Sequence, residues 1–240
     1  MFRYSYIDVV RLSLIMLSLM LAGCGGLSLP VTPSPTELES PSPSPTFAVE
    51  DTASKIDKVL NDLTEREAFT GAVLVARNGE VLLRQGYGLA DRERNIPNTP
   101  QTKYRLGSIT KQFTAMAILM LQAQDKLNVQ DPICRYISEC PITWQDITIH
   151  HLLTHTSGIP NLTDFHDYQA TKATPSPPEQ TIARFKDKPL GFPPGEQWSY
   201  SNSGYIVLGH IIEQASGLSY EAFLQQYIFE PLQMKDTVNS

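Results

Sequence analysis

The segment Thr110–Gln124 constrains the fold of this chain more than any other, because it is apolar on nearly every side. Its apolar residues recur at helical spacing and are Phe113, Met116, Ala117, Leu119, Met120 and Leu121. A helix with this pattern has no wide polar face to turn toward water, so we expect it to lie in the core of a globular domain. That placement would also bury Lys111 near the start of the helix, where an amine more readily sheds its proton.

Ser108 precedes Lys111 by three residues, at the point where this helix is expected to begin. At that spacing two side chains share one helix face and can touch. A serine hydroxyl is a poor nucleophile until a neighbouring base takes its proton, and a lysine in dry surroundings can act as that base. The pair alone is weak evidence, since serine and lysine meet at this spacing by chance in most proteins.

A second motif, Trp198-Ser-Tyr-Ser-Asn-Ser-Gly-Tyr205, follows about ninety residues later. Tyr200 and Asn202 are two residues apart, so an irregular loop or a short extended stretch would present both side chains to one side. A tyrosine hydroxyl can relay protons to a leaving group, and an amide can hold the lysine or a substrate carbonyl. Ser201 and Ser203 flank Asn202, but neither has a lysine three residues on, so both rank below Ser108 as nucleophiles.

Two further runs complete a recognisable order of motifs. Between the first two motifs lies Ile149-His-His-Leu-Leu-Thr-His-Thr-Ser-Gly-Ile-Pro160, and Phe192-Pro-Pro-Gly195 comes just before the second. From about Lys55 to its end, the chain resembles the serine β-lactamase-like hydrolases, which include class C β-lactamases, low-molecular-weight DD-peptidases and related esterases. The resemblance implies an α+β fold, with an antiparallel sheet flanked by helices and a helical subdomain.

The resemblance also implies a role for each motif residue. Ser108 would be the acylated nucleophile, Lys111 its activating partner, Tyr200 the proton carrier and Asn202 a positioning amide. The backbone N–H of Ser108 would supply half of an oxyanion hole. The family's third motif, Lys-Thr-Gly or His-x-Gly, does not occur after Asn202. We therefore expect the chain to be a fragment that lacks the other oxyanion donor and the C-terminal strands of the sheet.

The N-terminal residues predict export and a lipid anchor. Arg3 and Arg11 precede the apolar run 12–22, which is too short for a comfortable transmembrane helix and ends in Leu21-Ala-Gly-Cys24. This ending resembles the bacterial lipobox, in which the cysteine is diacylated and becomes the first residue; an uncleaved short anchor or a chance cysteine is the alternative. We expect a signal peptide at 1–23, a Pro/Ser/Thr-rich tether at 24–50 and the hydrolase domain at 51–240.

The other two cysteines and the net charge indicate where the protein is located and which partners it binds. Cys134 and Cys140 are six residues apart and could close a small disulfide loop in an exported protein, although two free buried thiols are the alternative. The net charge is −6, with lysine and arginine scattered along the chain, so a nucleic acid is an unexpected partner. We expect membrane attachment through the lipid anchor at the outer face of the cell envelope or in the periplasm.

The pattern predicts several other elements and leaves one pair of histidines ambiguous. Helices are expected at 51–67, 148–155, 205–216 and 220–229, and a hairpin with a tight turn at Asn78-Gly79 is expected over 71–84. His151 and His155 are four residues apart, a spacing that could bind zinc from one helix face. No glutamate follows His151 directly, and the intervening Leu152-Leu153 favours packing, so we expect no metal at these histidines. We expect no other cofactor either.

Three functions remain open at this point. The first is a serine acyl-transfer hydrolase acting on peptidoglycan D-Ala peptides, as a DD-peptidase does. The second keeps the same chemistry and is a β-lactamase or a small-ester esterase. The third is a catalytically silent binding module, because the third motif is absent. The location near the cell wall, where peptidoglycan peptides are found, favours the first over the second.

Overall fold

The computed structural model describes residues 47–238 and divides the chain into two compact units. One unit holds the described residues up to Asp62 together with 75–83, and the other holds 63–74 and the residues from 84 onward. The expected signal peptide, the lipidation candidate Cys24 and the tether up to residue 46 lie outside the described residues. Ser108, Lys111, Tyr200 and Asn202 all belong to the second unit.

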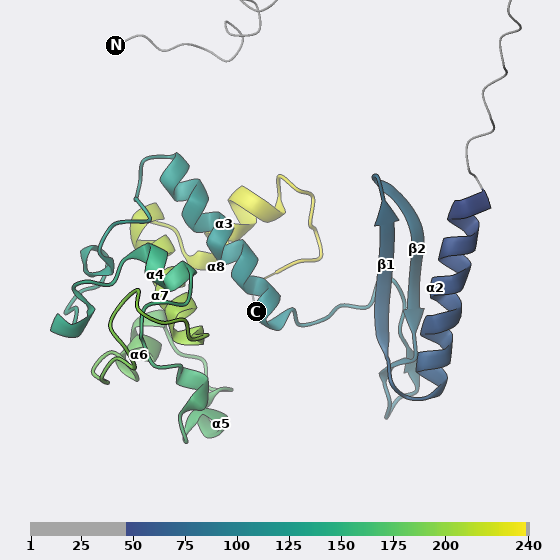
Figure 1. Cartoon of the computed structure of the whole chain (residues 1–240), viewed down its shortest axis with the longest axis horizontal. Coiled ribbons are helices and arrows are strands. Elements are labelled where there is room, and N and C mark those ends of the chain that lie inside the picture. The colour runs from purple at the N-terminus through teal and green to yellow at the C-terminus, as the bar shows by residue number, and fades with distance from the viewer. Residues whose placement is uncertain (1–46, 239–240) are drawn as a thin grey trace, which may run out of the picture. The chain divides into compact units, whose positions relative to one another are not determined.

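Residues 47–97, the first part of the chain that the structure describes, form one helix and two small sheets (Figure 1). Helix α2, Phe47–Glu65, begins four residues before the predicted Asp51, because no proline follows Pro45 to interrupt it. Strands β1, Gly71–Arg77, and β2, Glu80–Tyr87, form the predicted hairpin, and Asn78 and Gly79 both take positive φ in its turn. Strands β3, Leu89–Asp91, and β4, Ile96–Pro97, form a second, antiparallel sheet.

The rest of the second unit is helical. Its α-helices are α3, Thr110–Ala123; α4, Ile149–Leu153; α5, Tyr168–Thr171; α6, Pro178–Ala183; α7, Asn202–Ser216; and α8, Tyr220–Leu224. Its short turns are η1, Gly107–Ile109; η2, Ile133–Arg135; η3, Ile142–Trp144; η4, Leu162–Asp164; and the π-helical η5, Gln225–Phe229. Helices with small antiparallel sheets agree with the expected α+β class.

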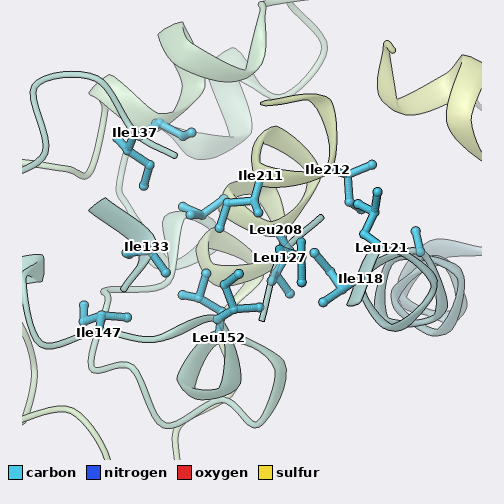
Figure 2. Close-up of a cluster of buried hydrophobic side chains, with 14 of the residues drawn as sticks. Ile118, Leu121, Leu127, Ile133, Ile137, Ile147, Leu152, Leu208, Ile211 and Ile212 are labelled. Carbon is cyan, nitrogen blue, oxygen red and sulfur yellow. The ribbon is translucent and has the colours of Figure 1, made fainter. Parts of the chain in front are cut away.

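Helix α7 is the centre of the helical core. It packs against α3, α4, α6 and α8, which are gathered around it in Figure 1. Leu208, Ile211 and Ile212 of α7 are fully buried, and Figure 2 shows them among Ile118 and Leu121 of α3. Burying an aliphatic side chain of this size stabilises the fold by about 1.5–3 kcal/mol relative to leaving it exposed. The two helices that begin at the predicted motifs are therefore held together by an apolar contact.

Helix α3 lies in the core as expected, but with one face only. Ala117, Ile118 and Leu121 are fully buried against the core, but Met116 and Leu119 on the other side are 50% and 48% exposed. The core of the described residues therefore covers one face of α3, and the pattern of apolar residues alone could not show which face.

The segment between α3 and α4 carries the disulfide candidates. Cys134 and Cys140 are bonded to each other, with their Cα atoms 5.3 Å apart, and the bond closes the loop between them. Both cysteines pack against the core beside Ile133 and Ile137. Among residues 47–238 no helix is both long enough and apolar enough to cross a membrane.

Two motif runs from the sequence lie against each other at Gly158. The backbone of this residue has a φ of 76°, and a Cβ atom added to it would stand 2.1 Å from the carbonyl oxygen of Phe192. The N–H of Gly191 donates to the carbonyl of Gly158, and that of Gly195 donates to the carbonyl of Thr156. The close approach of these two backbones requires glycine at position 158.

We predict that Gly158→Ala destabilises the protein far more than Gly217→Ala. Gly217 ends α7 at a φ of 75°, but a Cβ there would meet nothing within 4 Å. Gly217→Ala should cost only the left-handed backbone strain of about 1–2 kcal/mol, whereas Gly158→Ala adds the steric clash and should cost about 2–5 kcal/mol. Denaturant unfolding of the two variants measures the difference. Equal losses would contradict the close contact between positions 158 and 192.

Candidate active site

Ser108 and Lys111 lie where the predicted helix begins. Ser108 is in the η1 turn, which leads directly into α3, and Lys111 is in the first turn of α3. The Lys111 Nζ atom lies 3.4 Å from Ser108 Oγ. The serine hydroxyl therefore has an amine neighbour, and its backbone N–H belongs to the first turn of a continuous helical segment, where N–H groups lack intrahelical partners.

Tyr200 reaches this serine from the segment that precedes α7. Its hydroxyl lies 2.7 Å from Ser108 Oγ, the distance of a good O–H···O hydrogen bond. The next residue, Ser201, is the N-cap of α7, where its Oγ accepts from the N–H of Gly204. The same hydroxyl donates to the carbonyl of Ile159. The cap thus fixes the backbone directly after Tyr200.

Asn202 is the first residue of α7, so the motif is not the continuous loop that its spacing suggested. Its Oδ1 accepts a 2.7 Å hydrogen bond from Lys111 Nζ. Its side-chain N–H groups donate to Asn161 Oδ1 and Thr163 Oγ1, each at 3.2 Å, and its backbone N–H donates to Asn161 Oδ1 at 3.0 Å. These donors leave only the carbonyl oxygen of the amide for Lys111, which sets the orientation of the amide.

Lys111 also lies over two aromatic rings. Its Nζ is 4.7 Å from the ring centroid of Tyr200 and 5.4 Å from that of Tyr205. Ring faces attract a cation at these distances. Together with Asn202 Oδ1 and Ser108 Oγ, the two rings restrict where the Lys111 amine can lie.

The pKa of Tyr200 lies below its ordinary value. Burial raises it, but hydrogen bonding with Lys111 and Ser108 and the positive charge of Lys111 outweigh the burial. The pKa of Tyr205 moves the other way, raised by burial and by the neighbouring Tyr200. Of the two tyrosines beside Lys111, Tyr200 is therefore the one prepared to give up its proton.

A cavity of about 800 Å³ in the second unit is lined by three of the four motif residues, all but Tyr200. Ser108 and Lys111 stand at its wall, with Asn202, Thr163, Tyr205 and Tyr220 among the other lining residues. A volume of this size is in the range of small-molecule sites. The cavity gives a substrate of that size access to Ser108.

The structure brings together all four residues that the sequence predicted, and it adds partners that the sequence analysis missed. Asn161 and Thr163 orient Asn202, and the only signal for them was their place just after the Thr-Ser-Gly run. His155 also belongs to the site, since its ring centroid is 4.7 Å from that of Tyr200.

The two histidines do not share a helix face. His151 lies in α4, where its Nδ1 accepts from the backbone N–H of Thr148 in a capping box. His155 comes after the end of the helix, at a φ of 60°. Within residues 47–238, no group of three or more His, Cys, Asp or Glu side chains is placed to hold a metal ion.

Known proteins resemble this chain over most of its length. A family model described as Beta-lactamase matches residues 56–239. Penicillin-binding protein 4* of Bacillus subtilis (strain 168) is 33% identical over 186 residues, which cover 76% of this chain and 40% of that protein. Esterase EstB of Burkholderia gladioli is 34% identical over 207 residues, which cover 77% of this chain and 50% of the esterase.

A solved structure also resembles this chain. The octameric penicillin-binding protein homologue from Pyrococcus abyssi matches with a TM-score of 0.64 and 37% sequence identity, over 77% of this chain and 43% of that chain. The chain spans between 40% and 50% of the length of the two curated relatives described above.

We predict that Lys111→Met raises the pKa of Tyr200. The substitution removes the hydrogen bond and the positive charge that lower this pKa, while the burial that raises it remains. Ultraviolet titration of tyrosinate, with the signal of Tyr200→Phe subtracted, measures the change. Lys126→Met, which removes an exposed lysine beyond the end of α3, is the control and should leave the titration unchanged. An unaltered pKa in Lys111→Met would contradict the electrostatic role of Lys111.

Proposed function

The chain belongs to the beta-lactamase family, and we propose that it is a serine acyl-transfer hydrolase in which Ser108 forms an acyl-enzyme. The observation that carries the proposal is the 2.7 Å hydrogen bond between Ser108 Oγ and the hydroxyl of Tyr200, beside an amine 3.4 Å from the same oxygen. A nucleophile in contact with a base, and a base held by a third group, is the arrangement that activates serine.

In the proposed acylation, Ser108 Oγ gives its proton to the phenolate oxygen of Tyr200 and attacks the substrate carbonyl. The charge that develops on the carbonyl oxygen faces the backbone N–H of Ser108. Tyr200 then donates the proton to the leaving group as the scissile bond breaks. In the second half of the reaction, a water molecule gives a proton to the phenolate of Tyr200 and attacks the acyl-enzyme. Tyr200 returns the proton to Ser108 Oγ as the acid product leaves.

Lys111 is proposed to support this proton transfer electrostatically. Its charge favours the phenolate form of Tyr200, whose lowered pKa is closer to a neutral working pH. Asn202, oriented by Asn161 and Thr163, holds the amine in place. The short bond from Ser108 to Tyr200 supports the tyrosine as the immediate proton acceptor, with the lysine as its partner.

We favour peptidoglycan D-Ala peptides as substrates. This choice is supported by relatives named as penicillin-binding proteins, one of which is 33% identical to this chain. Small esters are the second candidate, supported by the 34% identity to an esterase. Both substrate classes present a carbonyl to a nucleophilic serine, and the cavity of about 800 Å³ has room for either.

Intact mass spectrometry after incubation with acylating probes tests the proposal. We expect a stable penicillin adduct on the wild-type protein, release of D-Ala from a D-Ala-D-Ala peptide, and no adduct on Ser108→Ala. Ser199→Ala, which removes a hydroxyl from the segment that carries Tyr200, should be labelled like the wild type. Rapid hydrolysis of simple esters without D-Ala release would favour the esterase. If no probe forms an adduct, the catalytically silent binding module is the remaining candidate function.

We also propose that the protein is held at the outer face of the cell membrane by lipid on Cys24. The support is the sequence alone: a basic start, a short apolar run and Leu21-Ala-Gly-Cys24. Two acyl chains give stable attachment, whereas one gives only marginal binding. The proline-rich tether would extend the domain toward the cell wall, where peptide substrates are located.

We predict that Cys24→Ala releases the protein from the membrane fraction. The substitution removes the thiol that would be acylated and leaves the described residues unchanged. Cell fractionation with immunoblotting, together with mass analysis of the N-terminal peptide, measures the outcome. Retention of Cys24→Ala in the membrane fraction would rule out lipid on this residue as the anchor.

A further inference from the structure

His155 contacts the backbone on both sides of Tyr200. Its carbonyl oxygen accepts a 2.9 Å hydrogen bond from the N–H of Ser199, and its side-chain Nδ1 accepts a 3.2 Å hydrogen bond from the N–H of Ser201. One residue thus binds the neighbours of the tyrosine before and after it in the chain. This pair of bonds restricts the backbone from which the phenol extends.

The imidazole ring also lies against the phenol itself. The centroids of His155 and Tyr200 are 4.7 Å apart, with the planes inclined by 34°. The ring centroids of Tyr205 and Trp198 lie 5.2 Å and 6.1 Å from the centroid of the same imidazole. Tyr200 is 38% exposed, so its ring needs a rigid neighbour if its hydroxyl is to stay at Ser108. His155 supplies that neighbour.

The hydrogen bond to Nδ1 fixes the chemical form of this histidine. An Nδ1 atom that accepts from a backbone N–H carries no proton, so the ring is neutral and its proton is on Nε2. Burial lowers the pKa of His155, and the positive charge of Lys111 lowers it further. Both effects keep the imidazole in the neutral form that the hydrogen bond requires.

The backbone at His155 is itself unusual. The residue has a φ of 60°, a conformation that side-chain-bearing residues seldom adopt and that asparagine tolerates better than most. The turn carries the chain out of α4 and directs the imidazole toward Tyr200. Strained backbone of this kind persists where surrounding structure requires it, and here both backbone and side chain of His155 bind the Tyr200 segment.

From this geometry we infer that His155 is a positioning residue for Tyr200, which holds the phenol oxygen at Ser108 through a backbone clamp and a ring contact. The inference rests on the proposed function, because it assigns His155 a part in acylation at Ser108. It differs from a plain packing role, since a packing histidine would affect stability without acting through the tyrosine hydroxyl.

Three substitutions in the full-length protein test the inference by the rate of Ser108 acylation with a penicillin or a chromogenic ester. His155→Phe keeps an aromatic ring but removes the acceptor for Ser201 N–H, and should lower the acylation rate by about 10- to 100-fold with little change in KM. His155→Asn keeps an acceptor and suits the positive φ, so it should remain within about tenfold of the wild type. His150→Asn, an exposed neighbour in α4, is the matched control and should be unchanged.

A double-mutant cycle with Tyr200→Phe separates positioning from general destabilisation. If His155 acts through the tyrosine hydroxyl, His155→Phe should cost nothing further once that hydroxyl is absent. Additive losses in the double variant, or a rate in His155→Phe within about twofold of the wild type, would overturn the inference. If His155→Phe fails to fold, His155→Ala, which also removes the acceptor for Ser201 N–H, takes its place in the cycle under the same criterion of additivity.

A second readout does not depend on activity. The NMR signal of Tyr200 Cζ, from isotope-labelled tyrosine, should shift in His155→Phe and stay unchanged in His150→Asn. If the wild type is not acylated but this shift occurs, the proposed function fails while the contact that positions Tyr200 holds. An unshifted signal in His155→Phe would overturn the positioning role even if the wild type is acylated.

Discussion

The packing of α3 against α7 is the constraint on which the candidate site depends. Each helix begins at a motif: Ser108 and Lys111 lie at the start of α3, and Tyr200 and Asn202 lie at the start of α7. The buried side chains between the helices bring their first turns together, and the 2.7 Å hydrogen bond from Lys111 to Asn202 crosses the contact. Because packed interiors resist small displacements, this apolar contact sets the distances among the polar groups.

The segment from the end of α4 through η4 holds the site residues in place. Within about ten residues it supplies His155 beside Tyr200, the carbonyl of Ile159 to the cap of α7, and Asn161 and Thr163 to the amide of Asn202. Gly158 lets the same segment approach the backbone at Phe192. Precise placement of reacting groups requires neighbours of this kind, since a shift of about 1 Å can cost 100-fold in rate.

The sequence predicted much of the local structure and the identity of the reacting groups. The α+β class is confirmed, and the resemblance to the β-lactamase-like hydrolases is confirmed by the match over residues 56–239. The hairpin at Asn78-Gly79 and the end of α7 at Gly217 were predictable because turn and cap residues act over a few positions. The sequence could not predict which face of α3 is buried, because the exposed Met116 and Leu119 are as apolar as the buried Ile118 and Leu121.

The amino-acid sequence was sufficient to identify the groups that could do chemistry, because serine, lysine, tyrosine and asparagine carry their nucleophilic, basic and amide groups wherever they are placed. The fold was needed to show that Tyr200 lies at hydrogen-bonding distance from Ser108, while Ser201 donates to the carbonyl of Ile159 and Ser203 is buried against the carbonyl of Pro160. It also decided that His155 contacts Tyr200 and does not pair with His151 across a helix face. The physical reason is that these relations depend on contacts between segments about 40 to 90 residues apart, and spacing along the chain carries no record of such contacts.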